Sequence, residues 1–157
     1  MAQFYRICPV AGEADRMAVK DGEHHAKLKR TDRPYYKELV DFFHSYDLPV
    51  VLHSCGGIEA ALPLIVEAGF DALNPMEVKA GCDALRFAEQ VRDQLAFIGG
   101  LDARVLESGD REWIRCEVIR LVEGMKAMGA RYVFGSDHSL STNIRYVDTS
   151  YPPRFGY

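Results

Sequence analysis

The hydrophobic and polar positions of this chain alternate between short apolar runs and longer segments with helical periodicity. Apolar runs bounded by glycine, proline and asparagine predict strands, and apolar residues spaced three and four apart predict helices. The longest helical pattern carries Trp113, which its spacing assigns to the core. The predicted strands cover residues 49–53, 70–74, 95–98 and 132–134, and the predicted helices cover residues 34–47, 58–68, 82–92 and 110–128.

The order of these elements predicts the fold class. Four consecutive strand-helix units imply parallel strands joined by right-handed crossovers. Residues 50–52 and 96–98 are apolar throughout, as strands covered on both faces should be. We therefore predict an α/β fold, either a doubly wound sheet or part of a (β/α)8 barrel. A complete barrel takes about 250 residues, so a chain of 157 residues holds about half of one.

Composition excludes several classes of partner. The chain is 48% hydrophobic and 27% charged, which is ordinary for a soluble globular protein. A net charge of −4 gives no electrostatic basis for binding nucleic acid or an anionic membrane. No apolar run approaches the roughly 20 residues of a membrane span, and the first residues lack the apolar segment of a secretory signal. With four cysteines and no CxxC pair, we expect free thiols in the cytoplasm.

Polar side chains follow the ends of all four predicted strands. In parallel α/β folds, ligands bind at the carboxyl ends of the strands, so these residues are expected to share one rim. The alternative is that these residues have no function, because surface loops are polar in most proteins. The rim residues are His53, Cys55, Asn74, Glu77, Asp102, Asp137 and His138.

The sequence His53-Ser-Cys55-Gly56-Gly57 carries the strongest chemical signal. Residues i and i+2 of a strand point to the same side, so His53 and Cys55 can aim a nitrogen and a sulfur at one point. Such a pair is half of a soft-metal site, most naturally for zinc. Gly56 and Gly57 allow a sharp turn or the close approach of a cofactor. The alternative is a packed histidine and cysteine without a ligand.

The other rim residues each carry two interpretations. His138 is the candidate third zinc ligand, or it binds a carboxylate substrate. Asp137 orients His138 or coordinates the metal, or it serves only as a turn residue. Glu77 is a ligand or the partner of one, or a solvated carboxylate. Asp102 positions a polar substrate or caps the short helix that follows.

Four motifs occur in an order that resembles the C-terminal half of the uroporphyrinogen decarboxylase superfamily. They are residues 53–57, 74–81, 99–102 and 135–138, and the resemblance covers about residues 32–157. The superfamily also contains zinc-dependent corrinoid and coenzyme M methyltransferases. The resemblance implies a (β/α)8 barrel whose site lies at the carboxyl rim.

Within that superfamily, the methyltransferases have a His-x-Cys pair after this strand, which His53 and Cys55 match. The resemblance then implies zinc held by His53, Cys55 and His138, and methyl transfer to a thiol from a corrinoid on a partner protein. The methyltransferases typically have a cysteine where this chain has His138. In the decarboxylases, the same place is similar to a Gly-His-Gly whose histidine contacts the substrate.

Two other functions therefore stay open beside methyl transfer. One is metal-free decarboxylation of uroporphyrinogen in haem biosynthesis, and the other is an inactive half-barrel that only binds or oligomerises. In the enzymatic cases Glu77 and Asp102 are assigned to orienting ligands or substrate, and Asp137 to tuning His138. Asn74, Gly56 and Gly57 are assigned to cofactor binding.

The length of the chain bears on its organisation. We predict an irregular segment over residues 1–31, poorly matched to the family, and a half-barrel domain over residues 32–157. The N-terminal half of the family, which grips the substrate carboxylates in the decarboxylases, has no counterpart. A half-barrel exposes two sheet edges and an open apolar interior, so we expect a homo-oligomer.

Overall fold

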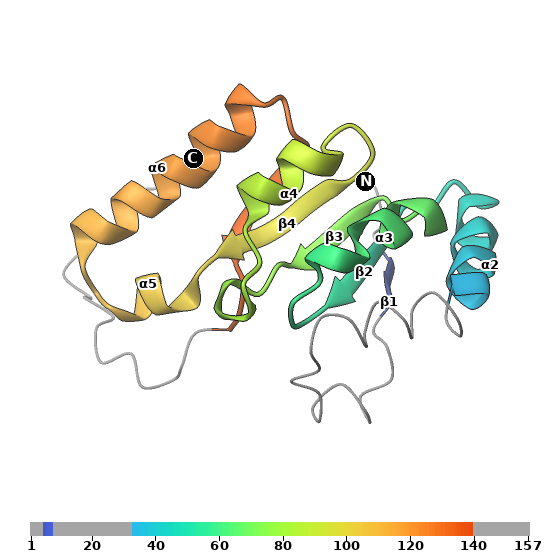
Figure 1. The fold of residues 1–157 in the computed structure, drawn as a ribbon, viewed down its shortest axis with the longest axis horizontal. Helices are drawn as coiled ribbons and strands as arrows, with labels where there is room; N and C mark the ends of the chain where they lie inside the picture. Colours follow the sequence, from blue (N-terminus) through green and yellow to red (C-terminus); the bar gives the residue numbers. More distant parts are fainter. Residues whose placement is uncertain (1–4, 8–32, 140–157) are drawn as a thin grey trace, which may run out of the picture.

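The fold is a five-stranded parallel sheet in which every strand is the spatial neighbour of the next one along the chain (Figure 1). The computed structural model describes residues 5–7 and 33–139. A doubly wound sheet would reverse its strand order part-way, and this sheet does not. The predicted α/β fold with parallel strands is confirmed, as part of a barrel. The strands are β1 (Tyr5–Ile7), β2 (Val50–Ser54), β3 (Ala72–Pro75), β4 (Ala96–Leu101) and β5 (Tyr132–Ser136).

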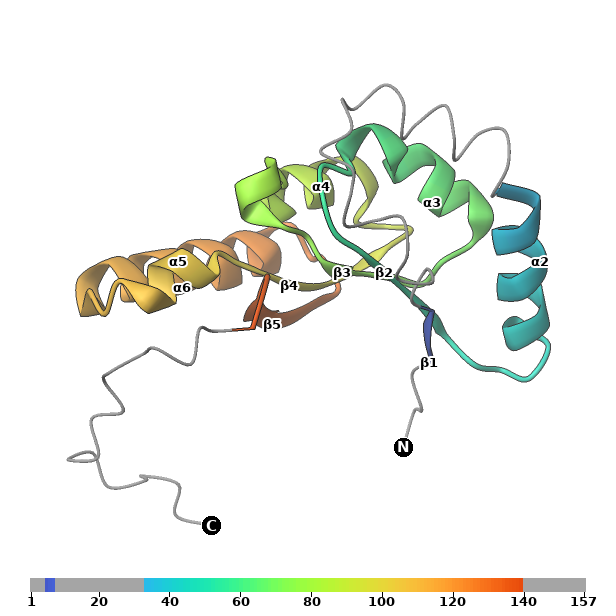
Figure 2. The same ribbon diagram turned by 90° about the horizontal axis from the view of Figure 1, so that it is seen from below.

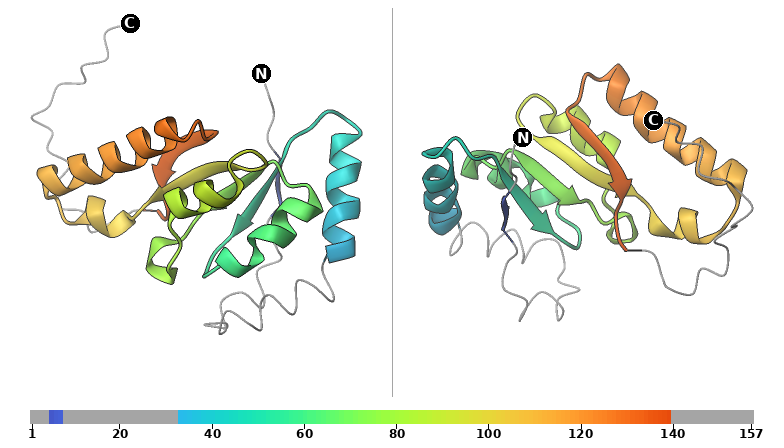
Figure 3. Two further views of the ribbon diagram at one scale, coloured as in Figure 1. Left: turned by 45° about the horizontal axis from the view of Figure 1, so that its top comes forward. Right: turned by 180° about the vertical axis from the view of Figure 1, so that it is seen from behind.

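Helices alternate with the strands. Figure 2 shows α3 and α4 over one face of the middle of the sheet, and Figure 3 shows α2 and α6 at its opposite ends. No helix within the described ranges is long and apolar enough to cross a bilayer. The helices are α2 (Arg33–His44), η3 (Glu59–Ala61), α3 (Leu62–Ala68), η4 (Val78–Ala80), α4 (Ala84–Val91), α5 (Ala103–Glu107) and α6 (Arg111–Ala127).

Local sequence sets where these helices begin and end. The carboxylates of Asp83 and Asp110 each accept two backbone N–H groups in the first turns of α4 and α6, which satisfies donors that have no partner inside the helix. Gly69 ends α3 in a left-handed conformation with φ of 89°, which glycine adopts without steric cost.

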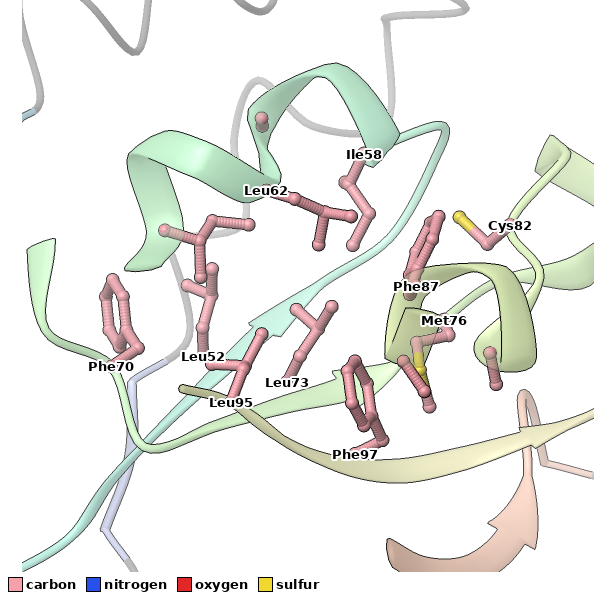
Figure 4. Packing of buried hydrophobic residues seen from close by; sticks show 14 of the residues in the cluster. Leu52, Ile58, Leu62, Phe70, Leu73, Met76, Cys82, Phe87, Leu95 and Phe97 are labelled. Atoms are coloured by element: carbon pink, nitrogen blue, oxygen red, sulfur yellow. The ribbon is translucent and has the colours of Figure 1, made fainter. Parts of the chain in front are cut away.

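The hydrophobic core lies between the sheet and the helices. Leu52, Leu73 and Phe97 project from three neighbouring strands toward Leu62 of α3 and Phe87 of α4 (Figure 4). All five side chains are buried. Full burial of such a side chain stabilises the fold by about 1.5–3 kcal/mol, so these contacts fix the helices onto one face.

The opposite face of the sheet carries the candidate chemistry. Because side chains alternate along a strand, Val51 and His53 point away from the face that Leu52 occupies. His53 is paired in register with Asn74 of β3. The sequence thus places a histidine and an asparagine side by side on the face that corresponds to the interior of a barrel.

Two sequence predictions are corrected by the structure. Tyr5–Ile7 forms a strand parallel to β2 inside the segment predicted to be irregular; three residues are too few for periodicity to reveal. Trp113 is 48% exposed, and α6 buries only Leu121 and Met125. Periodicity shows that a helix face is apolar, but it does not show whether a neighbour covers it.

Candidate functional site

The imidazole of His53 lies between the side chains of Cys55 and Asn74. Its Nδ1 is 2.8 Å from Asn74 Oδ1, and its Nε2 is 3.8 Å from Cys55 Sγ. His53 is in β2 and Cys55 follows that strand directly, so the two side chains meet as the i, i+2 spacing predicts. The structure therefore brings together a nitrogen and a sulfur at the carboxyl end of β2.

Asn74 determines which nitrogen of His53 carries the proton. The Asn74 amide Nδ2 donates to the backbone oxygen of Ile98 at 3.1 Å, which leaves Oδ1 as the acceptor facing His53. Nδ1 of His53 must then be the donor in its 2.8 Å contact. The tautomer follows from this network, and it turns the lone pair of Nε2 toward Cys55.

Glu77 connects the loops after β2, β3 and β5. Its Oε2 accepts the backbone N–H of Gly56 at 2.7 Å, and its Oε1 lies 3.2 Å from His138 Nε2 and 3.3 Å from Lys79 Nζ. Burial raises the pKa of Glu77, but the Gly56 N–H, His138 and Lys79 together hold it below its ordinary value. Glu77 is therefore an ionised, buried carboxylate at neutral pH.

His138 lies against Glu77. Its Nε2 is buried, and among the described residues it makes no aligned hydrogen bond despite the 3.2 Å approach of the carboxylate. Its backbone oxygen accepts the Ser136 hydroxyl at 2.7 Å. Across residues 5–7 and 33–139, no three His, Cys, Asp or Glu side chains are arranged to hold a metal ion. The role of His138 as a third zinc ligand stays a prediction.

Asp137 joins the last loop to the two before it. One carboxylate oxygen accepts Val78 N–H at 2.9 Å and the other accepts Ala103 N–H at 2.8 Å. Its own N–H donates to Leu101 O at 2.7 Å. The Asp137 side chain, predicted to orient His138, to coordinate the metal or to serve only as a turn residue, is buried and bound to two backbone donors.

Asp102 caps α5, the second of its two interpretations from sequence. Its carboxylate accepts the Arg104 backbone N–H at 2.9 Å and further hydrogen bonds from two guanidinium nitrogens of the same residue. The Arg104 guanidinium lowers the pKa of Asp102, burial opposes this, and the capping N–H lowers the pKa further. Among the described residues, the hydrogen bonds of the Asp102 carboxylate are with Arg104, whereas the next residue, Ala103, donates its N–H to Asp137.

One family model matches the chain. The uroporphyrinogen decarboxylase (URO-D) model covers residues 24–148. This chain belongs to the uroporphyrinogen decarboxylase family. The match includes every rim residue from His53 to His138, and it confirms the superfamily that the four motifs indicate. No curated protein matches the chain at a significant level.

The rim of this URO-D family chain also contains a hollow that the motif analysis did not identify. The hollow has a volume of about 380 Å³ and lies between the loops after β2 and β3. Cys82 lines it and donates from Sγ to Gly56 O at 3.2 Å, while burial raises the pKa of the thiol. Its lining consists of Gly57, Ile58, Glu59, Ala60, Ala80, Gly81 and Cys82.

Lys79 and Cys82 are neighbours of the site to which the sequence assigned no specific role. Lys79 lies inside the motif at residues 74–81, and Cys82 is the next residue after it. Their position beside a motif was the available signal. Their contacts with Glu77 and Gly56 depend on how two loops meet, which local sequence does not encode.

Proposed function

We propose that this uroporphyrinogen decarboxylase family protein uses zinc to transfer a methyl group from a methylated corrinoid, held by a partner protein, to a thiol. The observation that carries the proposal is the 3.8 Å separation of His53 Nε2 and Cys55 Sγ. Zn–N of about 2.05 Å and Zn–S of about 2.3 Å in a tetrahedral site put the two donor atoms about 3.6 Å apart. The pair is thus spaced as two ligands of one zinc ion are.

The residues around the pair suit that role. Neutral imidazole is the form that ligates a metal, and Asn74 holds His53 as the tautomer whose Nε2 has the lone pair. A hydrogen bond to the other ring nitrogen also fixes the ring orientation, as in well-formed zinc sites. When bound, zinc lowers the pKa of a coordinated thiol and so supplies a thiolate for methyl transfer.

His138 is proposed as the third ligand, and Glu77 as the residue that positions it. Glu77 Oε1 approaches Nε2 of the His138 ring, so ligation would use Nδ1. A buried carboxylate beside the second ring nitrogen raises the basicity of a histidine ligand. Asp137 supports this arrangement by tying the His138 loop to the backbone at Val78 and Ala103.

A second candidate is metal-free decarboxylation of a porphyrinogen. The observation that favours it is the position of His138, which lies with Glu77 and Lys79. A histidine held at the rim by a buried carboxylate is suited to contact an anionic substrate, as the histidine of the decarboxylases does. On this interpretation His53 and Cys55 are packed side chains and hold no metal.

Elemental analysis of the purified full chain tests the first proposal. We expect about one zinc per chain, strongly reduced in His53→Ala and in Cys55→Ser. Cys116→Ser is the matched control, because Cys116 is likewise an exposed cysteine outside any disulfide but lies on α6, away from His53. Loss of zinc in His138→Ala as well would support its role as the third ligand.

Two outcomes contradict the zinc proposal. Protein that contains no zinc after purification and dialysis against zinc, but binds a porphyrin, is the result expected of a decarboxylase. Protein that binds neither is the result expected of a half-barrel that serves only in binding or oligomerisation. Corrinoid-dependent thiol methylation is measured only if zinc is found.

A further inference from the structure

Cys82 is a buried nucleophile that the proposed methyl transfer does not use. It is 3% exposed and lies at the edge of the core beside Phe87 (Figure 4). Its Sγ donates to the backbone oxygen of Gly56 at 3.2 Å. Gly56 directly follows Cys55, so this hydrogen bond places the Cys82 sulfur one residue away from the cysteine of the candidate zinc pair.

Glu77 holds the loops that carry the two cysteines together. The N–H of Gly56 donates to Glu77 Oε2 at 2.7 Å, and the N–H of Cys82 donates to the backbone oxygen of Glu77 at 3.3 Å. Glu77 therefore binds the loop after β2 through its side chain and the start of the Cys82 segment through its backbone. The closeness of Cys55 and Cys82 follows from these contacts, although the cysteines belong to different loops.

The two cysteines differ in their access to solvent. Cys55 is exposed, whereas Cys82 is buried. Burial raises the pKa of the Cys82 thiol, the Ile58 N–H opposes this, and the charges of Glu77 and Glu59 raise the pKa further. A buried, protonated thiol reacts slowly with a dissolved oxidant. Of these two cysteines, Cys55 is therefore the one that an oxidant reaches first.

The loop between the two sulfurs has room to move. Gly56 has φ of 86° and, among the described residues, nothing within 4 Å of an added Cβ. Gly57 and Cys82 both line the hollow of about 380 Å³. The Cys55 sulfur lies toward His53 and the Cys82 sulfur toward the Gly56 oxygen, so the backbone must rotate before the sulfurs can meet. Two glycines in sequence allow that rotation without steric cost.

We propose that Cys55 and Cys82 are joined by a disulfide when the chain is exposed to a peroxide. A disulfide joins Cα atoms about 4.4–6.8 Å apart. The Cys82 sulfur already contacts the residue next to Cys55. Closure therefore needs a loop shift on the order of 4 Å, the distance between consecutive Cα atoms.

The reaction has two steps. The Cys55 sulfur attacks one oxygen of the peroxide, the O–O bond breaks, and the products are a sulfenic acid and water. The Cys82 sulfur then attacks the sulfenic sulfur, the S–O bond breaks, and the hydroxyl group leaves with the Cys82 proton as a second water. In total, two thiols are oxidised to one disulfide and one hydrogen peroxide is reduced to two waters.

The disulfide gives the candidate site a means of regulation. A sulfur held in a disulfide is no longer the thiolate that ligates zinc, so oxidation removes Cys55 from the His53–Cys55 pair. This consequence rests on the proposed zinc function, whereas formation of the disulfide does not. Disulfides of cytoplasmic proteins are usually of this transient, redox-sensing kind.

Peptide mapping of the full chain tests the proposal, because trypsin places each of the four cysteines in a peptide of its own. The purified protein is treated with hydrogen peroxide, remaining thiols are alkylated, and the unreduced digest is analysed by mass spectrometry. We expect a cross-linked pair formed by residues 38–79 and 80–86, which contain Cys55 and Cys82. The pair should disappear after reduction. If the purified chain contains zinc, one zinc should be released for each disulfide formed.

Variants test the order of the two steps. In Cys82→Ala, the sulfenic acid of Cys55 has no second thiol to react with, so dimedone, a diketone that traps sulfenic acids, should label residues 38–79 more strongly than in the wild type. In Cys55→Ser, the buried Cys82 should stay reduced. Cys116→Ser is the matched control and should form the disulfide as the wild type does. Circular dichroism checks that each variant folds.

Three outcomes overturn the proposal. The first is a cross-link from Cys55 to Cys8 or to Cys116. The second is equal dimedone labelling of Cys55 in the wild type and in Cys82→Ala. The third is a wild-type chain in which both thiols remain reduced, whether or not the chain contains zinc. Because disulfide and zinc are measured separately, failure of this inference is distinguished from failure of the proposed function.

Discussion

At the scale of single residues, two buried carboxylates have different tasks. Both oxygens of Asp137 are bound to backbone N–H groups, so this side chain holds loops together. Only one oxygen of Glu77 is bound in that way, and the other meets His138 and Lys79. Asp137 is therefore a structural residue, while Glu77 is placed to act on the histidine beside it.

Substitution of Asp137 tests the structural assignment. In Asp137→Asn, an NH2 group faces one of the two N–H donors, which leaves a buried donor unsatisfied. We expect a loss of about 2 kcal/mol in the free energy of unfolding, measured by urea denaturation. Asp93→Asn is the control, because the Asp93 side chain is 86% exposed. Equal stability of Asp137→Asn and wild type would contradict the assignment.

Asp102 gives a pH-dependent prediction. Its pKa is lowered in the folded chain by Arg104, so its interaction stabilises the fold above the unfolded pKa of about 3.9 and is lost as pH falls through the folded pKa. The Arg104 side chain is 62% exposed, so solvent screens its interaction with Asp102 and the effect on stability is small.

The measurement compares wild type with Asp102→Asn, which keeps an oxygen for the helix cap. The difference in the free energy of unfolding should shrink between about pH 6 and about pH 3. A difference that is constant over this range would mean that the charge of Asp102 does not contribute.

At the scale of elements, the end of β4 shows why glycine is needed where loops converge. Gly99 has φ of 102°, and a Cβ there would lie 2.8 Å from Pro75 O and 3.0 Å from Ser136 O. The backbones of β3 and β5 therefore approach β4 more closely than any side chain permits. This close approach brings the loops that carry Glu77 and His138 together over one strand.

Gly99→Ala should cost about 3 kcal/mol in the free energy of unfolding, from the left-handed backbone conformation and the overlap with backbone oxygens. Gly109→Ala separates the two causes. Gly109 has φ of 67° and nothing within 4 Å of an added Cβ, so it should lose only about 1 kcal/mol. Equal losses in the two variants would show that the close approach is unimportant.

At the scale of the whole molecule, exposed apolar side chains are found in only a few of the described elements. The core accounts for one face of the sheet, and the nine exposed large hydrophobic side chains of the described residues lie on α2 with its following turn, on α6 and on β5. Trp113 is the chain's one tryptophan and lies in the first turn of α6. Its fluorescence therefore reports whether a second copy covers α6 in the homo-oligomer expected from the sequence.

Trp113 fluorescence should depend on protein concentration. On dilution from tens of micromolar to below one micromolar, its emission should shift to longer wavelength and become easier to quench with acrylamide, because dissociation exposes the indole. A wild-type spectrum that does not change with concentration would mean that Trp113 is not covered by a partner.

Part of the site was predictable because it is local. His53 and Cys55 are two residues apart on one strand, and strand geometry alone puts their side chains together. The polar residues at the strand ends were likewise predictable as a rim, since parallel strands end on one side. The four strands and the main helices followed from periodicity, and their boundaries moved by only a few residues.

The remaining features depend on contacts between residues far apart in the chain. Glu77 meets Gly56 and His138, and Asp137 binds Val78 and Ala103, only because neighbouring strands bring their loops together. The exposure of Trp113 likewise depends on which neighbour is present. Sequence determined the elements and the His53–Cys55 pair through short-range geometry. Tertiary structure decided which backbone N–H groups bind Glu77 and Asp137. It also decided which apolar helix faces stay exposed, because both depend on packing between residues far apart in the chain.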